Sequence, residues 1–261
     1  MENNISNREV YNTRMARTVI DKIFFLAHID ADVFVDFGCA NGEVLRAINN
    51  FVPESMCIGY DISLEMINEA KSLSPDNFIF TNSLRDVERI VTKEREKGRK
   101  VCLILSSVIH EIYSYSTPQE VHDFWVFANE WGLFDYIAIR DMAYSSLDDK
   151  FSHIELSHLT KIASRDYNKE INDFTKKWGS IDEGVNAIHF LLKYQYKENW
   201  DREVAENYLP ISFSTYFKKL SFYKCIYQHR YVLPYIKKCI LRDFGLELKI
   251  PTHCQLIFER K

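Results

Sequence analysis

Long hydrophobic runs are absent from this chain of 261 residues. The longest apolar stretches, such as Ile23–Ala27 and Val101–Leu105, are far shorter than the roughly 20 residues that cross a bilayer. No secretory signal pattern is visible either. We therefore expect neither a membrane span nor a membrane partner.

Patterned cysteines are also absent. The six cysteines are scattered, and no two of them form a C-x-x-C pair. This usage argues against a disulfide framework and favours a cytoplasmic protein. Because 46% of the residues are hydrophobic and 27% are charged, the chain has enough apolar surface to bury a sizeable core.

Positive charge is scarce over most of the chain. The first 210 residues carry a net charge of −11, whereas the segment 211–250 has eight Lys or Arg and only two acidic residues. A basic region of this kind can follow a phosphate backbone. A solvated helix face beside a buried strand has the same composition, so a nucleic-acid partner stays one of two interpretations.

The front half of the chain alternates short β-branched runs with helical patterns, which is typical of βαβ units and a parallel sheet. Thr117 and Glu120 form a capping box at the start of one of these helices. The expected strands are Val33–Asp36, Met56–Asp61, Phe78–Phe80, Val101–Leu105 and Tyr136–Arg140, and the expected helices are Val10–Leu26, Glu43–Phe51, Leu64–Ser72, Leu84–Arg95 and Pro118–Trp131.

No strand pattern is visible between Ser145 and about Leu209, where the spacing of apolar residues predicts amphipathic helices. We expect this segment to be a helical insertion that forms a lid. Helices at Phe213–Leu220 and Pro234–Phe244 and strands at Tyr223–Tyr227 and Cys254–Phe258 are expected after it. The chain is thus divided into an α/β core over 1–144, the insertion over 145–209, and the C-terminal part of the core over 210–261.

A turn of small residues follows the first strand directly. In the segment Val33–Glu43, the hydrophobic strand leads through Gly38, Ala40 and Gly42 into a helix. Such a turn lets the backbone approach a ligand closely, and the helix start presents N–H groups without partners. Asp61 ends the second strand 19 residues after Gly42, the spacing at which an acid accepts hydrogen bonds from a ribose. A nucleotide-like ligand is therefore expected.

In these residues the chain resembles the class I S-adenosylmethionine-dependent methyltransferases. Their first motif is an acidic residue followed by G-x-G-x-G, and Asp36, Gly38, Ala40 and Gly42 follow it with alanine in place of the middle glycine. A dinucleotide fold prefers G-x-G-x-x-G, so NAD is the weaker interpretation. The resemblance covers roughly Val10–Arg140 and the closing strand pair. It implies a Rossmann-like α/β fold with a mostly parallel sheet and a final antiparallel strand, and S-adenosylmethionine as the cofactor.

The resemblance also implies where the parts of the cofactor lie. The methionine moiety lies along the turn Gly38–Gly42, the ribose on Asp61, and the adenine against Ile62, Met66 and the residues after the third strand. Two residues of the leading helix close over the cofactor. For Tyr11 and Met66, packing in the core is the alternative. The whole expected set is Tyr11, Arg14, Asp36, Gly38, Cys39, Ala40, Gly42, Asp61, Ile62, Met66, Asn82, Ser83 and Ser106.

The fourth strand continues into Ser106–Tyr113, a segment that we expect to be a loop. Ligands of such sheets bind beyond the carboxyl ends of the strands, so this loop is expected to face the transferable methyl group. With an unperturbed pKa of about 6.5, His110 is the candidate base for a hydroxyl or an amine, and Glu111 orients it or is itself the base. In the alternative, His110 binds a loop carbonyl and Glu111 is solvated or caps the backbone.

Several motifs are missing from the acceptor side. The chain lacks the Asn or Asp followed by two prolines and an aromatic residue that amino-methylating DNA enzymes carry, and it lacks the Pro-Cys of pyrimidine-carbon enzymes. His153 and His158 are five residues apart and do not form an i, i+4 metal pair. We therefore expect no metal site.

These patterns together predict an enzyme that methylates oxygen or nitrogen of a small or medium-sized acceptor under the lid. Three alternatives stay open. They are methylation of RNA or another nucleic acid through the basic region, transfer of an aminopropyl-type group from a decarboxylated donor, and a role as a non-catalytic partner subunit. The sequence sets neither the acceptor nor the oligomeric state.

Overall fold

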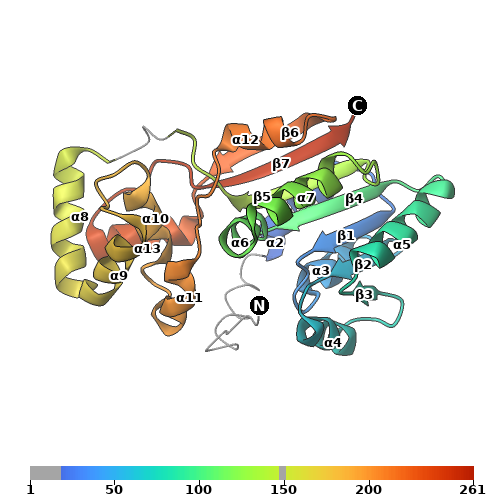
Figure 1. The fold of residues 1–261 in the computed structure, drawn as a ribbon, viewed down its shortest axis with the longest axis horizontal. Coiled ribbons are helices and arrows are strands. Elements are labelled where there is room, and N and C mark those ends of the chain that lie inside the picture. The colour runs from blue at the N-terminus through green and yellow to red at the C-terminus, as the bar shows by residue number, and fades with distance from the viewer. Residues whose placement is uncertain (1–18, 147–150) are drawn as a thin grey trace.

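The computed structural model describes residues 19–146 and 151–261, in which seven strands form one mixed sheet of order β3-β2-β1-β4-β5-β7-β6 (Figure 1). Strands β1 to β5 are parallel, and β7 lies antiparallel between β5 and β6. This confirms the Rossmann-like sheet of class I methyltransferase type that the sequence predicts. The strands are β1 (Val33–Phe37), β2 (Met56–Tyr60), β3 (Ile79–Thr81), β4 (Val101–Ser106), β5 (Tyr136–Met142), β6 (Tyr223–Tyr231) and β7 (His253–Arg260).

Helices cover both faces of the sheet. Alternate residues of the central strand β4 face opposite sides: Leu103 and Leu105 pack in one apolar cluster, and Cys102 and Ile104 in another. Because both faces are covered, all six residues of β4 are buried and the strand is almost continuously apolar. The first face is covered by α5 (Leu84–Glu96), α7 (Pro118–Asn129) and α12 (Phe213–Lys219), and the second by η1 (Phe24–Ala27), α3 (Glu43–Phe51) and α4 (Leu64–Leu73).

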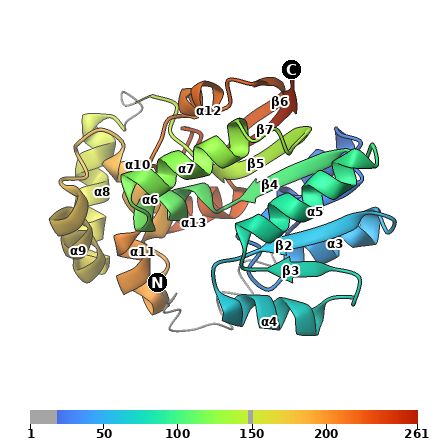
Figure 2. The same ribbon diagram turned by 45° about the vertical axis from the view of Figure 1, so that its right-hand side comes forward.

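A third apolar cluster lies beside one end of the sheet (Figures 1 and 2). Its short amphipathic helices bury one another's apolar faces, so that Phe174, Phe190 and Phe244 are fully buried. The helical insertion after β5 is therefore confirmed, and α13, which the sequence assigns to the C-terminal part of the core, packs with it. The helices are α8 (His153–Asp166), α9 (Asn168–Trp178), α10 (Asn186–Lys193), η2 (Lys197–Asn199), α11 (Trp200–Ala205) and α13 (Pro234–Phe244).

Local signals account for some element ends and not for others. The capping box at α7 is confirmed, since Thr117 Oγ1 accepts from Glu120 N and Glu120 Oε2 accepts from Thr117 N. The leading helix is not continuous to Leu26 as expected. In the described residues α2 (Val19–Lys22) ends first, and the 3-10 turn η1 follows it. None of the described helices combines the length and the apolarity needed to cross a membrane.

Candidate functional site

The turn between β1 and α3 contains three residues with positive φ: Gly38 at 77°, Ala40 at 45° and Gly42 at 79°. The N–H groups of Gly38 and Cys39 donate to Tyr60 O at the end of β2, over 2.8 and 2.9 Å. Gly42 is the N-cap of α3 and has no side chain to cap the first N–H groups of that helix. Such a turn can bind a polar ligand through backbone N–H groups.

Asp61 joins this turn to the end of β2. Its carboxylate accepts hydrogen bonds from Ala40 N over 2.9 Å and from Ser63 N over 2.8 Å. Burial raises the pKa of the Asp61 carboxyl above its ordinary value. A carboxylate has about four acceptor positions, so about two remain for the hydroxyls of a ligand. Asp61, which the sequence predicts to bind a ribose, therefore stabilises the conformation of the turn.

Gly38 and Gly42 are required for two reasons: their φ angles are positive, and neighbouring side chains leave no room for a Cβ. A Cβ on Gly38 would lie 2.7 Å from Val108 Cγ2, and a Cβ on Gly42 would lie 2.9 Å from Phe80 Cζ. The sequence suggests that the turn is free of side chains because a ligand approaches it. For Gly42 the close neighbour in the structure is instead a phenylalanine of β3.

The residues expected around the adenine differ in exposure. Ile62 follows Asp61, and its apolar side chain is 74% exposed. Met66 in the first turn of α4 is partly buried, and Asn82 is exposed. The hydroxyl of Ser83 is engaged as the N-cap of α5.

Two further expected residues lie inside the protein near the turn. Cys39 is buried, and burial raises the pKa of its thiol. Ser106 Oγ at the end of β4 is buried and has no hydrogen-bond partner within residues 19–146 and 151–261. Tyr11 and Arg14 lie outside the described residues, and their expected role is not tested.

Asp36 is a buried acid at the end of β1. Burial raises its pKa to about 7, although the charge of Lys22 acts in the opposite direction. Lys22 on α2 is itself buried, and burial together with the charge of Arg140 lowers its pKa to about 8. Asp36, the acidic residue of the first motif, is thus buried, and Lys22 is a second buried titratable group whose charge acts on it.

On the acceptor side, the segment after β4 is a helix and not the expected loop. Helix α6 (Ile109–Tyr115) begins after Val108, which offers no side-chain acceptor as N-cap. The carboxylate of Asp141 at the end of β5 replaces such a cap, because its Oδ2 accepts from Ile109 N over 2.7 Å. His110 and Glu111 are therefore held in the first turn of a helix by an acid on another strand.

His110 is 6% exposed, and its Nδ1 lies 2.7 Å from Asp141 Oδ1. Burial alone would lower the pKa of the ring, but the carboxylates of Asp141, Glu206 and Glu111 outweigh it and raise that pKa to about 9. The same pair holds the pKa of Asp141 below its ordinary range despite burial. The three carboxylates therefore favour the protonated form of the ring, and its pKa lies above the unperturbed value from which the sequence argument starts.

The helical insertion contributes charged groups to the same place. Arg202 Nη2 lies 2.7 Å from Glu111 Oε1 and 2.8 Å from Glu206 Oε1. Tyr115 OH donates to Glu206 Oε1 over 3.0 Å. Burial and the charge of Glu206 raise the pKa of Glu111, whose side chain is 27% exposed and pairs with Arg202. These contacts join α6 to α11 and to the segment that follows it.

A cavity of about 130 Å³ opens between the sheet edge and the insertion. One wall is apolar and aromatic, with Leu192, Tyr208 and Ile236 among its side chains. Its polar lining includes His110, Glu111, Arg140, Arg202, Glu203 and Glu206. The predicted acceptor residues His110 and Glu111 thus line a cavity beside the end of β4.

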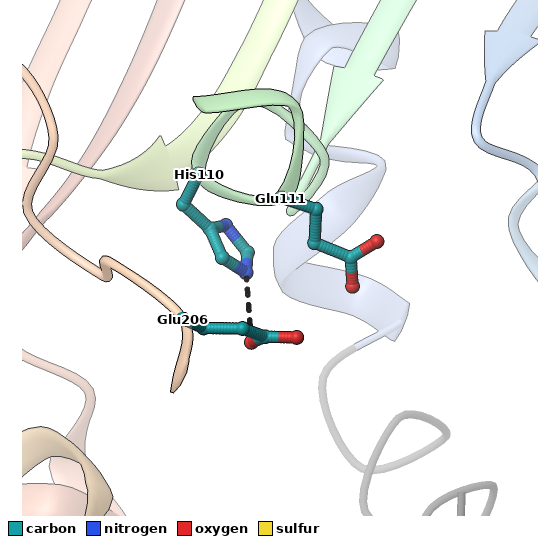
Figure 3. Close-up of side chains that lie close together, drawn as sticks. All are labelled: His110, Glu111 and Glu206. Atoms are coloured by element: carbon teal, nitrogen blue, oxygen red, sulfur yellow. Dashed lines mark ion pairs between the residues drawn. The ribbon is translucent and has the colours of Figure 1, made fainter. Parts of the chain in front are cut away.

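Three potential metal ligands converge at this cavity, although the sequence led us to expect no metal site. The ligating atoms of His110, Glu111 and Glu206 all lie within 4.8 Å of one another (Figure 3). By contrast, His158 Nε2 lies 2.8 Å from Phe244 O. Sequence reasoning missed Asp141, whose place at the end of a hydrophobic strand was an available signal, and Glu206, for which no local signal exists.

Comparisons with known proteins find similarity in structure only. No family model matches the sequence, and no curated protein matches it significantly. One similar solved structure is a SAM-dependent methyltransferase from Anabaena variabilis ATCC 29413, with 12% identity over 95% of this chain and 85% of that chain and a TM-score of 0.48. A second is the plantazolicin methyltransferase BpumL in complex with a monoazolic desmethylPZN analog and SAH, with 14% identity over 98% of this chain and 88% of that chain and a TM-score of 0.46. A third is a protein from Pyrococcus horikoshii OT3, with 10% identity over 98% of this chain and 94% of that chain and a TM-score of 0.49. The fold assignment rests on the strand order of the sheet itself.

Replacing Ala40 by glycine is expected to raise the free energy of unfolding by about 0.5–1 kcal/mol. The left-handed region costs a non-glycine residue about 1–2 kcal/mol, and glycine offsets part of this gain because it makes the unfolded chain more flexible. A second comparison tests the neighbours of the turn, because Gly38→Ala adds a close contact with Val108 to the cost of a positive φ. Its control is Gly98→Ala, since Gly98 has a φ of 80° and no atom lies within 4 Å of the place that an added Cβ would take. Urea unfolding should show Gly38→Ala to be less stable than Gly98→Ala, and a destabilised Ala40→Gly variant would contradict the explanation.

Asp36→Asn is expected to change how stability depends on pH. Because the pKa of Asp36 is about 7 in the folded protein and lower in the unfolded chain, its contribution is complete below about pH 4 and is lost as the pH rises through about 7. The free energy of unfolding of the wild type, relative to Asp36→Asn, should fall by up to about 1.4 kcal/mol per pH unit across this window. Denaturation at several pH values measures it, with the exposed Asp76→Asn as control. A difference that does not vary with pH would refute the raised pKa.

Proposed function

We propose that the protein binds S-adenosylmethionine at the turn Gly38–Gly42 and transfers its methyl group to oxygen or nitrogen of a small or medium-sized acceptor beside His110. The observation that carries this proposal is the 2.9 Å hydrogen bond from Ala40 N to Asp61 Oδ2, which unites the predicted methionine and ribose contacts. They meet at the edge where sheets of this kind bind nucleotides. Once bound there, S-adenosylmethionine supplies an electrophilic methyl group.

The residues on the cofactor side fit such a ligand. A polar ligand group at the end of β4 would give the buried Ser106 Oγ a partner, which it lacks among the described residues. A flat aromatic base would cover the exposed side chain of Ile62. Asp61 keeps acceptor positions for the ribose hydroxyls, and Met66 and Asn82 complete the adenine side in this proposal.

The cavity favours a small or medium-sized acceptor over a polynucleotide. Its volume of about 130 Å³ has room for a small molecule and not for a polynucleotide chain. The insertion, with Tyr208 in its wall, excludes water from the acceptor. His110 and Glu111 prepare the nucleophilic atom of the acceptor in this proposal, and Asp141 fixes the orientation of the His110 ring.

Asp61→Ala should weaken the binding of S-adenosylmethionine and of its demethylated product by about 1–3 kcal/mol, because charge-assisted hydrogen bonds to the ribose are lost. Titration calorimetry measures both ligands, and the wild type should bind one of either per chain. Asp76→Asn removes an exposed charge elsewhere and should bind like the wild type. If the folded wild type binds neither ligand, the proposed function is wrong.

His110→Ala should lower turnover about 10²–10⁴-fold, in the range usual for loss of an acid–base group, while cofactor affinity changes little. The reason is that His110 faces the acceptor cavity and not the turn that binds the cofactor. Turnover is measured from pH 6 to 9 on any acceptor found in a screen, with the exposed His122→Ala as matched control. Full turnover of His110→Ala throughout this range would show that the histidine is structural.

A further inference from the structure

We propose that His110, Glu111 and Glu206 bind a divalent transition-metal ion. This inference goes beyond the proposed methyl transfer, because it concerns a second ligand and because its test needs neither S-adenosylmethionine nor an acceptor. The donor atoms come from two parts of the chain, α6 and the segment after α11, and all lie within 4.8 Å of one another (Figure 3).

The ring of His110 is presented as a metal ligand. Asp141 Oδ1 engages Nδ1 over 2.7 Å, which fixes the ring and leaves Nε2 as the outward nitrogen. A carboxylate behind a ligating histidine is the usual arrangement in metal sites. Nε2 points toward Glu206 (Figure 3) and has no hydrogen-bond partner in the described part of the chain, although the residue is only 6% exposed.

The separation between His110 Nε2 and Glu206 Oε2 is 4.0 Å. This separation is too long for a hydrogen bond between the two atoms. A metal ion about 2.1 Å from each ligand places two ligands about 3–4.2 Å apart. The 4.0 Å separation therefore falls within the range of distances between two ligands of one ion.

The two carboxylates are oriented by groups that leave oxygen atoms for the ion. Arg202 Nη2 contacts the Oε1 atoms of both Glu111 and Glu206, and Tyr115 OH donates to Glu206 Oε1. Glu206 Oε2 is consequently the atom turned toward His110. One guanidinium nitrogen shared by Glu111 and the buried Glu206 resembles the outer partners that hold metal ligands in place.

The donor set selects the class of ion. One imidazole nitrogen with two carboxylates suits Mn²⁺, Fe²⁺, Co²⁺ or Zn²⁺, whereas Mg²⁺ and Ca²⁺ prefer sites made of oxygen alone. An ion at this place would also bind the acceptor hydroxyl or amine and promote loss of its proton to water. The lone pair of that acceptor atom then forms the bond to the methyl carbon, while the electron pair of the carbon–sulfur bond passes to sulfur.

The test is direct binding of Mn²⁺ and Co²⁺, added separately to untagged, chelator-treated protein near neutral pH. Electron paramagnetic resonance measures free Mn²⁺, and visible absorption reports the Co²⁺ ligands. We expect one ion per chain, and binding weaker by about 10-fold or more in Glu206→Gln and His110→Ala. Asp141→Asn should weaken binding by about 10–100-fold through the orientation of the ring.

Asp201→Asn is the matched control, because Asp201 is an exposed acid of α11, the helix that precedes Glu206, and this variant should bind the ions like the wild type. Circular dichroism confirms that each variant is folded. No binding by the wild type, or binding that Glu206→Gln leaves unchanged, would overturn the metal site. Calorimetry with S-adenosylmethionine on the same samples separates the two proposals, since cofactor binding without metal binding refutes only the metal site.

Discussion

The acceptor side of the molecule depends on one buried carboxylate, that of Asp141 at the end of β5. Its Oδ2 accepts from Ile109 N and thereby begins α6, and its Oδ1 engages Nδ1 of His110. Charge-assisted hydrogen bonds in a buried environment are strong, and the histidine keeps the pKa of this acid low despite burial. The same group therefore sets where the helix begins and which way its histidine faces.

The second half of the acceptor side comes from the insertion, and it is held by equally specific contacts. Asn207 N donates to Ser114 Oγ over 2.7 Å, so the backbone after α11 is attached directly to α6. Lys193 is fully buried and donates from Nζ to Glu203 O over 2.8 Å and also to Glu206 O. The lysine replaces the missing backbone donors at the end of α11. The position of the Glu206 side chain thus follows from the packing of the helical cluster.

The sheet and the turn after β1 could be predicted because their signals are local. A parallel strand covered on both faces is an apolar run such as Val101–Leu105, and the turn after β1 and Asp61 follow from spacing alone. Helix α6 was missed because Val108 supplies no capping side chain, and the cap comes from a residue 33 positions later in the chain. Glu206 was missed for the same kind of reason, since only tertiary packing brings it to His110.

The turn after β1 and the start of α6 lie close together because Gly38 has no side chain. A Cβ on Gly38 would lie 2.7 Å from Val108 Cγ2, and Val108 is the residue from which α6 begins. The positive φ of Gly38 turns the chain at this contact, and the missing Cβ lets the turn after β1 lie directly against the start of the helix that carries His110. In the proposed methyl transfer the two reacting atoms must lie about 3–3.5 Å apart. Gly38 would then set how closely the two halves of the proposed site approach each other, which is a stricter requirement than room for either ligand alone.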